Sequence, residues 1–131
     1  MSYVPQCTEH VAFTSVAAST TNAPVDITVP PECIVEKVVV IIKDAFDQSG
    51  VTLDIGHKTD DDFFTPTAID VDSPSNNTEA TPQVLWTPVA TLPDRVIRFT
   101  LADSVGTAST GAVYAYAVYR FAENVHPTRV V

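Results

Sequence analysis

The sequence predicts an all-β protein that folds as a single-domain antiparallel β-sandwich. Short runs rich in Val, Ile and Thr recur along its 131 residues, and these β-branched side chains fit a pleated sheet better than a helix. Turn-forming residues separate the runs at short intervals, as in a sandwich rather than in an alternation of strands and helices. The 10 prolines disfavour long helices, because proline breaks the helical hydrogen-bond ladder.

The first two strands are expected at residues 11–16 and 25–29, with a turn of small and polar residues between them. In the second run every other residue is Val or Ile, which is the period of a strand with one buried face. This run ends at Pro30 and Pro31, because proline has no amide hydrogen to donate to a sheet.

The strongest strand signal lies in the middle of the chain. Residues 37–43 form a Val- and Ile-rich run that is too short to span a membrane and too β-branched to favour a helix. Val51, Leu53 and Ile55 then alternate with small or polar residues, as expected of a half-buried strand. A turn-like segment at residues 44–50 separates the two runs, so we expect a β-hairpin here.

The second half of the chain predicts further strands, which brings the total to roughly seven or eight. They are expected at residues 68–71, 83–87, 89–91, 95–101 and 112–121. The last of these has apolar residues on both faces, which is typical of a central strand covered on both sides or of a strand that faces a partner. Residues 58–67 and 72–82 are expected as surface loops.

The chain has the length of one domain, and its 131 residues are enough to bury a core. We expect an N-terminal arm at residues 1–10, a β-sandwich domain at residues 11–121 and a C-terminal tail at residues 122–131. No export signal is recognisable, so we expect Cys7 and Cys33 to be reduced thiols.

The charge balance argues against several kinds of partner. The formal net charge is −9 and only 7 Lys and Arg residues are present, so we expect no contact with nucleic acid, whose phosphates require clustered cations. No apolar run approaches the length of a membrane span, and no membrane contact is expected. An acidic surface suits docking onto a basic or mixed-charge protein surface.

One cluster in the sequence has the composition of a metal site. Asp60, Asp61 and Asp62 offer the oxygen ligands that Ca²⁺ prefers, but their spacing does not fit the 12-residue helix-flanked calcium loop, so we interpret them as a solvated loop. The histidines lie far apart in the sequence, which argues against zinc. No nucleophile elbow, phosphate loop or dinucleotide motif is present. We therefore expect no catalytic residue, no metal and no cofactor, and we expect that the protein is not an enzyme.

Several short patterns resemble small jelly-roll proteins of tailed bacteriophage particles. Ala45, Phe46 and Asp47 follow a Val-rich strand, and the strand that ends in Leu53, Asp54, Ile55 and Gly56 comes next. The pattern continues with Asp62, Phe63 and Phe64 and closes with a Gly-, Ala- and Thr-rich turn at residues 104–111 before a final Val- and Tyr-rich strand. The likeness spans about residues 11–121.

This resemblance implies a jelly-roll-like sandwich and a structural role in the virion. Such proteins are capsid decoration or cement proteins that are made in the host cytoplasm, sit on the capsid exterior as homotrimers and clamp the major capsid protein. The resemblance supplies no catalytic residues. The alternative in the same setting is a tail- or head-fibre-associated module that recognises a host surface glycan through the loops at residues 58–67 or 72–82.

The two arms and the last strand supply the candidate contact residues. We expect the arms to become ordered when they bind the capsid lattice, and Tyr114 and Tyr116 share a strand face that suits a core or a protein interface. The candidate interface residues are Tyr3, Val4, Cys7, His10, Tyr114, Tyr116, Val125, His126, Arg129 and Val130.

Overall fold

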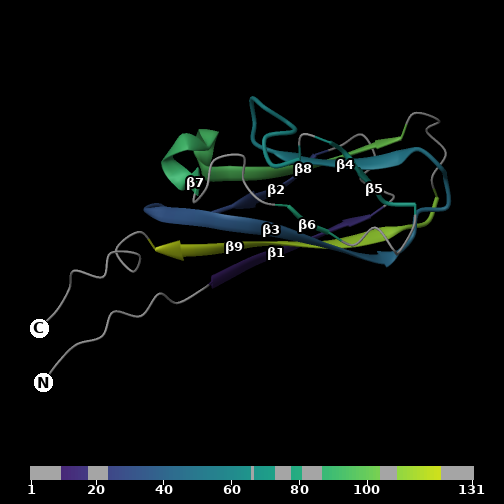
Figure 1. Ribbon diagram of the computed structural model, residues 1–131, viewed down its shortest axis with the longest axis horizontal. Helices are drawn as coiled ribbons and strands as arrows, with labels where there is room; N and C mark the ends of the chain where they lie inside the picture. Colours follow the sequence, from purple (N-terminus) through teal and green to yellow (C-terminus); the bar gives the residue numbers. More distant parts are fainter. Residues whose placement is uncertain are drawn as a thin grey trace, which may run out of the picture.

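In the computed structural model, two β-sheets pack face to face around one hydrophobic core (Figure 1). The structure describes residues 10–17, 24–65, 67–72, 78–80, 87–103 and 109–121, with the side chains of 78–80 left out. Over these residues the prediction of an all-β antiparallel sandwich is confirmed. Residues 1–9 of the expected N-terminal arm and the expected C-terminal tail at residues 122–131 lie outside the described residues.

Nine strands make up the described part of the sandwich. They are β1 (His10–Ala17), β2 (Pro24–Thr28), β3 (Cys33–Asp44), β4 (Val51–Gly56), β5 (Ile69–Asp70), β6 (Thr78–Ala80), β7 (Thr87–Pro88), β8 (Val96–Asp103) and β9 (Ala112–Phe121). One sheet has the order β1-β9-β3-β6, with β7 also paired to β3, and the other has the order β2-β8-β4-β5. All of these pairs are antiparallel.

The order of the strands is that of a jelly roll. Most strands that follow one another along the chain lie in different sheets, such as β1 and β2, β3 and β4, and β8 and β9; β4 and β5 are an exception, because they pair in one sheet. An eight-stranded jelly roll is built from two sheets with this kind of crossing between them. Here β7 is a short addition at the end of β3.

The prediction of a β-hairpin between residues 37–43 and 51–56 is wrong. β3 pairs with β9, β6 and β7, whereas β4 pairs with β8 and β5 in the other sheet. The segment between them carries the chain across the sandwich, and Phe46 within it is buried, with its amide donating to the carbonyl of Val71 at 3.0 Å. Alternation identifies two strands, but it does not say whether those strands pair with each other.

Two shorter segments also differ from expectation. Val89–Thr91 forms the 3-10 helix η3 instead of a strand, and the 3-10 helix η4 (Pro93–Arg95) follows it. β6 lies inside the segment expected as a loop, because its backbone pairs with Val38–Val40 of β3. The expected strand residues 83–86 lie outside the described residues. No helix among the described residues is long and apolar enough to cross a membrane.

Alternate residues of both sheets build the core. Each strand turns every second side chain inward, so that the two sheets bury a shared apolar layer. The inward residues include Val38, Val40 and Ile42 of β3, Val113, Ala115 and Ala117 of β9, Leu53 and Ile55 of β4, and Ile97, Phe99 and Leu101 of β8. Full burial of a large apolar side chain stabilises the fold by about 1.5–3 kcal/mol. Cys33 belongs to this core, while Cys7 lies outside the described residues.

Candidate protein interface on the outer sheet face

The first sheet has an apolar surface on the side that faces away from the core. In an antiparallel ladder, directly opposite residues point to the same face. Phe13 of β1 lies opposite Tyr116 of β9, which lies opposite Val39 of β3. Two neighbouring rows have the same form, and the three rows together make what we call the outer face. Its residues are Val11, Phe13, Ser15, Lys37, Val39, Ile41, Tyr114, Tyr116 and Val118.

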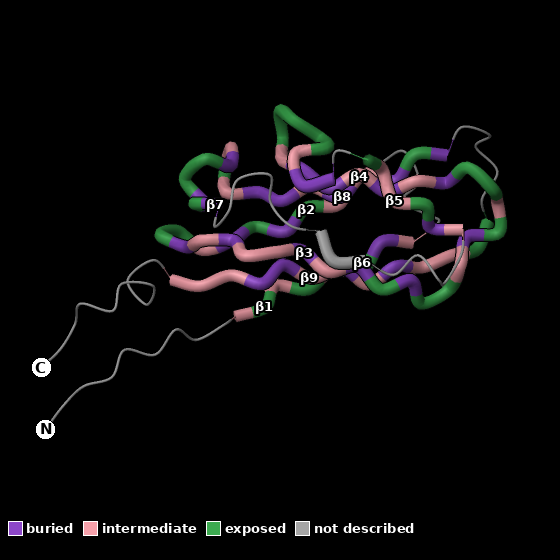
Figure 2. The backbone as a smooth tube through the Cα atoms, in the orientation of Figure 1, coloured by how far each residue is buried: buried purple, intermediate pink, exposed green. Residues whose placement is uncertain are grey.

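The exposed large apolar side chains of the described residues all belong to the outer face. Val11 is 58% exposed, Phe13 is 60% exposed and Ile41 is 39% exposed. Figure 2 shows the exposed stretches of β1 at the margin of the sandwich. Single exposed apolar residues are normal on a soluble protein, but a contiguous group marks a site of contact with another surface.

Aromatic rings stiffen the centre of the outer face. The rings of Phe13 and Tyr114 lie 5.4 Å apart between centroids, at an interplanar angle of 55°. The ammonium group of Lys43 lies 5.4 Å from the centroid of the Tyr114 ring, within range of a cation–π interaction. Tyr114 and Tyr116 are half-buried. Rings that are already held by neighbours lose little conformational freedom when a partner binds, so they suit an interface.

An ion pair lies at one end of the outer face. Arg120 of β9 donates from Nε to a carboxylate oxygen of Glu36 at 2.9 Å, and the two side chains are only 16% and 18% exposed. Glu36 stands at an irregularity in the pairing of β3, between Val35 and Lys37. This extra residue lets the strand present a carboxylate beside Arg120 while Val35 stays in the core.

His10, expected in the N-terminal arm, is the first residue of β1. Its ring stacks on Tyr119 at 5.5 Å between centroids and meets Phe121 edge-on at 5.1 Å. The start of β1 and the end of β9 therefore lie side by side at one end of the sandwich (Figure 1). His10 belongs to this aromatic cluster and is not part of the outer face.

The structure brings together two of the candidate interface residues. Tyr114 and Tyr116 lie on the outer face. The other candidates besides His10 lie outside the described residues: Tyr3, Val4, Cys7, Val125, His126, Arg129 and Val130. Val11, Phe13 and Ile41 were missed by the sequence reasoning. A signal for the first two was present, because residues 11–16 carry apolar side chains at both parities, as residues 112–121 do.

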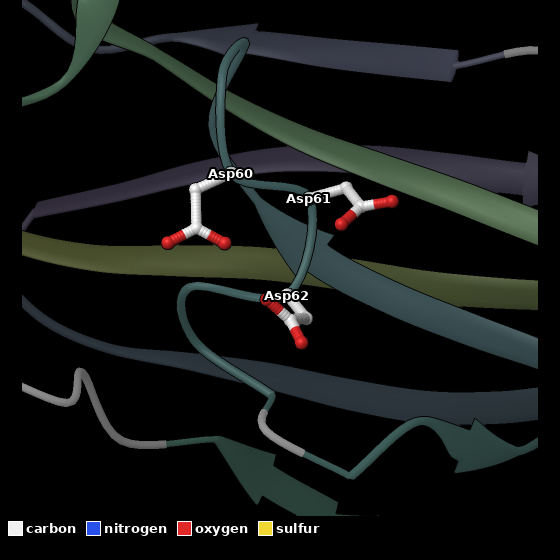
Figure 3. Close-up of side chains that lie close together, drawn as sticks. All are labelled: Asp60, Asp61 and Asp62. Carbon is white, nitrogen blue, oxygen red and sulfur yellow. The ribbon is translucent and has the colours of Figure 1, made fainter.

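The acidic run forms an exposed turn after β4. Asp60, Asp61 and Asp62 are exposed, and one carboxylate oxygen from each lies within 4.8 Å of the others. Figure 3 shows the three side chains leaving the loop in different directions. A hydrogen bond with Asp60 raises the pKa of Asp62 above its usual value, and the negative charges of Asp60 and Asp61 raise it further. Nearby, Lys58 forms an ion pair with Asp94 at 2.6 Å.

Comparison with solved structures finds the same fold in phage capsids. A chain of the capsid asymmetric unit of cyanophage Pam1 is similar to this chain with a TM-score of 0.65 and 24% identity, over 86% of this chain and 84% of that one. A chain of the acidic stable capsid structure of Helicobacter pylori bacteriophage KHP30 is similar with a TM-score of 0.61 and 13% identity, over 100% and 97% of the two chains. No protein-family model matches the chain, and no curated protein sequence matches it. The chain therefore shares its jelly-roll fold with chains from two phage capsid structures.

Proposed function

We propose that the protein is a non-enzymatic structural component of a phage virion, a decoration or cement protein that binds the outside of the capsid and stabilises the lattice of the major capsid protein. The observation that carries this proposal is the contiguous apolar outer face, presented by a jelly roll of the kind found in two phage capsid structures. A rigid apolar face serves attachment to another protein better than it serves chemistry on a small molecule.

The mechanism is thermodynamic. A protein that binds the assembled lattice and not its separate subunits stabilises the lattice by its binding free energy, which depends on its concentration and affinity. The outer face supplies the apolar area, and each buried square ångström contributes about 25 cal/mol before the costs of association are subtracted. The stabilisation is therefore expected to grow with the occupancy of the capsid sites.

Repeated weak contacts are part of the same proposal. Three copies held in a homotrimer would present three outer faces at once, and each later contact then forms at a high effective concentration. Residues 1–9 and 122–131 are proposed as further contacts with the lattice. The net charge of −9 favours a basic or mixed-charge capsid surface over nucleic acid as the partner.

A binding experiment with empty capsid shells tests the proposal. The protein is mixed with shells of the phage that encodes it, and the bound fraction is measured by co-sedimentation. Replacement of Phe13 or Ile41 by Asp places a charge on the outer face and is expected to weaken binding by about tenfold or more, because a buried unpaired charge is costly. The wild-type protein is also expected to raise the temperature at which the shells open.

Ala102→Asp is the matched control. Ala102 is exposed on β8, on the outward side of the opposite sheet, so this variant adds the same charge to a surface outside the proposed contact. It is expected to bind as the wild type does. Equal binding by all of these variants, or shells that open at the same temperature with and without the protein, would contradict the proposal.

A further inference from the structure

Strand β1 forms an edge of its sheet that lacks the usual protection against pairing. It pairs with β9 on one side, and the described residues place no strand on its other side. β1 has 8 residues, with no proline, aspartate, glutamate, lysine or arginine among them. An edge strand turns alternate backbone donors and acceptors away from its sheet, which makes it a template for another strand.

The other edge strands in the described part of the chain are protected. β2 begins with Pro24 and carries Asp26, which forms a bidentate ion pair with Arg98. β5 and β7 have two residues each, and β6 has three. Short length, proline and charge are the devices that keep natural sheet edges from joining other strands. β1 stands apart because it is long and uncharged.

We propose that β1 pairs antiparallel with β1 of a second copy of this chain, across a two-fold axis normal to the sheet. The two β1-β9-β3-β6 sheets then form one continuous sheet. This inference rests on the described strands and does not depend on the proposed function.

Charge favours β1 over the other described edges for pairing between two copies of this chain. Two molecules of net charge −9 repel each other, and like charges placed directly opposite in a ladder are destabilising. Pairing of β2 or β5 with its own copy would bring Asp26 or Asp70 of one molecule close to the same residue of the other. Pairing through β1 brings no carboxylate into the ladder. A two-fold contact also satisfies both edges at once, so the assembly closes and does not grow into a fibre.

The alternation of β1 limits how the two copies align. Opposite residues share a face, and the core face of each strand must stay inside, so odd-numbered residues must face odd-numbered residues. The axis therefore passes beside a residue, such as Ala12, Phe13 or Thr14, and not between two residues. With the axis beside Ala12, Val11 of one copy lies opposite Phe13 of the other; beside Phe13, the two Phe13 residues lie opposite each other; and beside Thr14, Phe13 lies opposite Ser15. In each register Phe13 of one copy therefore lies opposite, or diagonally next to, Phe13 of the other. The two outer faces become one apolar surface.

The mass of the protein in solution tests the pairing. We would measure it by analytical ultracentrifugation from micromolar to millimolar concentration. The double variant Val11→Lys with Phe13→Lys places like charges across the axis and is expected to halve the mass, from dimer to monomer, or from hexamer to trimer if a trimer also forms. Both residues are exposed, so the fold should remain, which circular dichroism checks.

Ile41→Lys is the matched control. Ile41 lies on the outer face, but on β3, separated from the free edge by β9 and β1. This variant is expected to keep the wild-type mass. Halving by both variants would point to a contact through the whole face, and halving by neither would mean that the edge is not an interface; either result overturns the proposal.

Amide hydrogen exchange supplies a second measurement. In the paired form, the β1 amides that point away from β9 donate to the second copy, so slow exchange is expected along the whole strand. In the double lysine variant every second amide of β1 should exchange rapidly, while β9 stays protected. Rapid exchange of those amides in the wild type, or protection that arises only when capsid shells are added, would overturn pairing with a second copy.

Discussion

The outward surfaces of the two sheets differ in chemistry, although both sheets bury the same kind of residue. On the β2-β8-β4-β5 sheet the outward rows are mostly polar or small, as where Asp26 lies opposite Arg98. On the β1-β9-β3-β6 sheet they are mostly apolar or aromatic, as where Phe13 lies opposite Tyr116. A sheet that meets water on one side normally alternates between apolar and polar residues. Within the described part of the chain, Val11, Phe13 and Ile41 of the apolar sheet stay exposed, and this difference between the sheets is what motivates the proposed attachment to another protein.

Alanine substitutions of two phenylalanines should separate the core from the outer face most clearly. Phe99 is fully buried beneath the polar sheet, so Phe99→Ala is expected to lower the free energy of unfolding by about 3–5 kcal/mol through lost burial and a cavity. Phe13 is 60% exposed, and Phe13→Ala should cost about 1 kcal/mol or less while it weakens binding to capsid shells. Chemical denaturation and co-sedimentation measure the two effects. A large loss of stability in Phe13→Ala would mean that the outer face is part of the folding core.

The ion pairs on the two sheets should also differ in how much they contribute to the free energy of unfolding. The difference is expected to be smaller than that between the two phenylalanines. Glu36→Gln leaves Arg120 with a weaker partner in a site where both side chains are less than one-fifth exposed, and we expect a loss of about 1–2 kcal/mol. Asp26→Asn disrupts a pair whose side chains are 27% and 33% exposed, and its effect should stay within about 1 kcal/mol. Urea denaturation at low and high salt checks the order. A larger loss in Asp26→Asn would contradict it.

The loop that crosses between the sheets should lose stability in acid. The carboxylate of Asp47 accepts hydrogen bonds from the hydroxyl of Ser109 at 2.7 Å and from the amides of Ser109 and Thr110 at 2.9 and 3.2 Å. These bonds lower the pKa of Asp47. The stabilisation is complete above the ordinary aspartate pKa of about 3.9 and is lost as pH falls through the depressed value. Asp47→Asn should melt a few degrees lower at neutral pH, and the difference should vanish at low pH; a constant difference would contradict the assignment.

On the polar sheet, the charge of Asp54 should affect stability in the opposite direction from that of Asp47, and by less. Burial raises the pKa of this carboxyl group, and the negative charges of Asp61 and Asp62 raise it further. The ionised form is therefore unfavourable in the folded state, and the penalty is present above the raised pKa and disappears as pH falls below the ordinary value of about 3.9. Asp54→Asn is expected to raise the melting temperature slightly at neutral pH and to leave it unchanged in acid. A lower melting temperature at neutral pH would show that the charge is stabilising.

Most of the longer strands could be predicted from the local pattern of apolar and β-branched residues. β2, β4, β8 and β9 were predicted within a few residues of their observed bounds, because each carries a strong period of two or a long β-branched run. β6 was not predicted, since its three residues have no apolar pattern and are held by backbone pairing with β3. The segment of η3 carries apolar residues like a strand, but Pro93 follows it closely and the amide of Leu92 bonds back to Val89 at 2.9 Å.

The candidate interface could be predicted only in part from the sequence. Tyr114 and Tyr116 were identified because residues 112–121 are apolar at both parities. Ile41 was not, because within a continuous run of Val and Ile no period shows which side faces the core. Pairing with β9 decides this, since it places Ile42 opposite Val113 in the core and Ile41 opposite Tyr114 outside.

The sequence by itself determined the all-β class and the parity of the clearly alternating strands, because side-chain periodicity is a local property of the backbone. Only the tertiary structure decided that β3 and β4 belong to different sheets, that Val11, Phe13 and Ile41 share one face, and that β1 lies at an edge. These features depend on pairing between distant segments, such as β1 with β9 and β2 with β8. Such pairing follows from the burial of the whole core, which no single segment specifies.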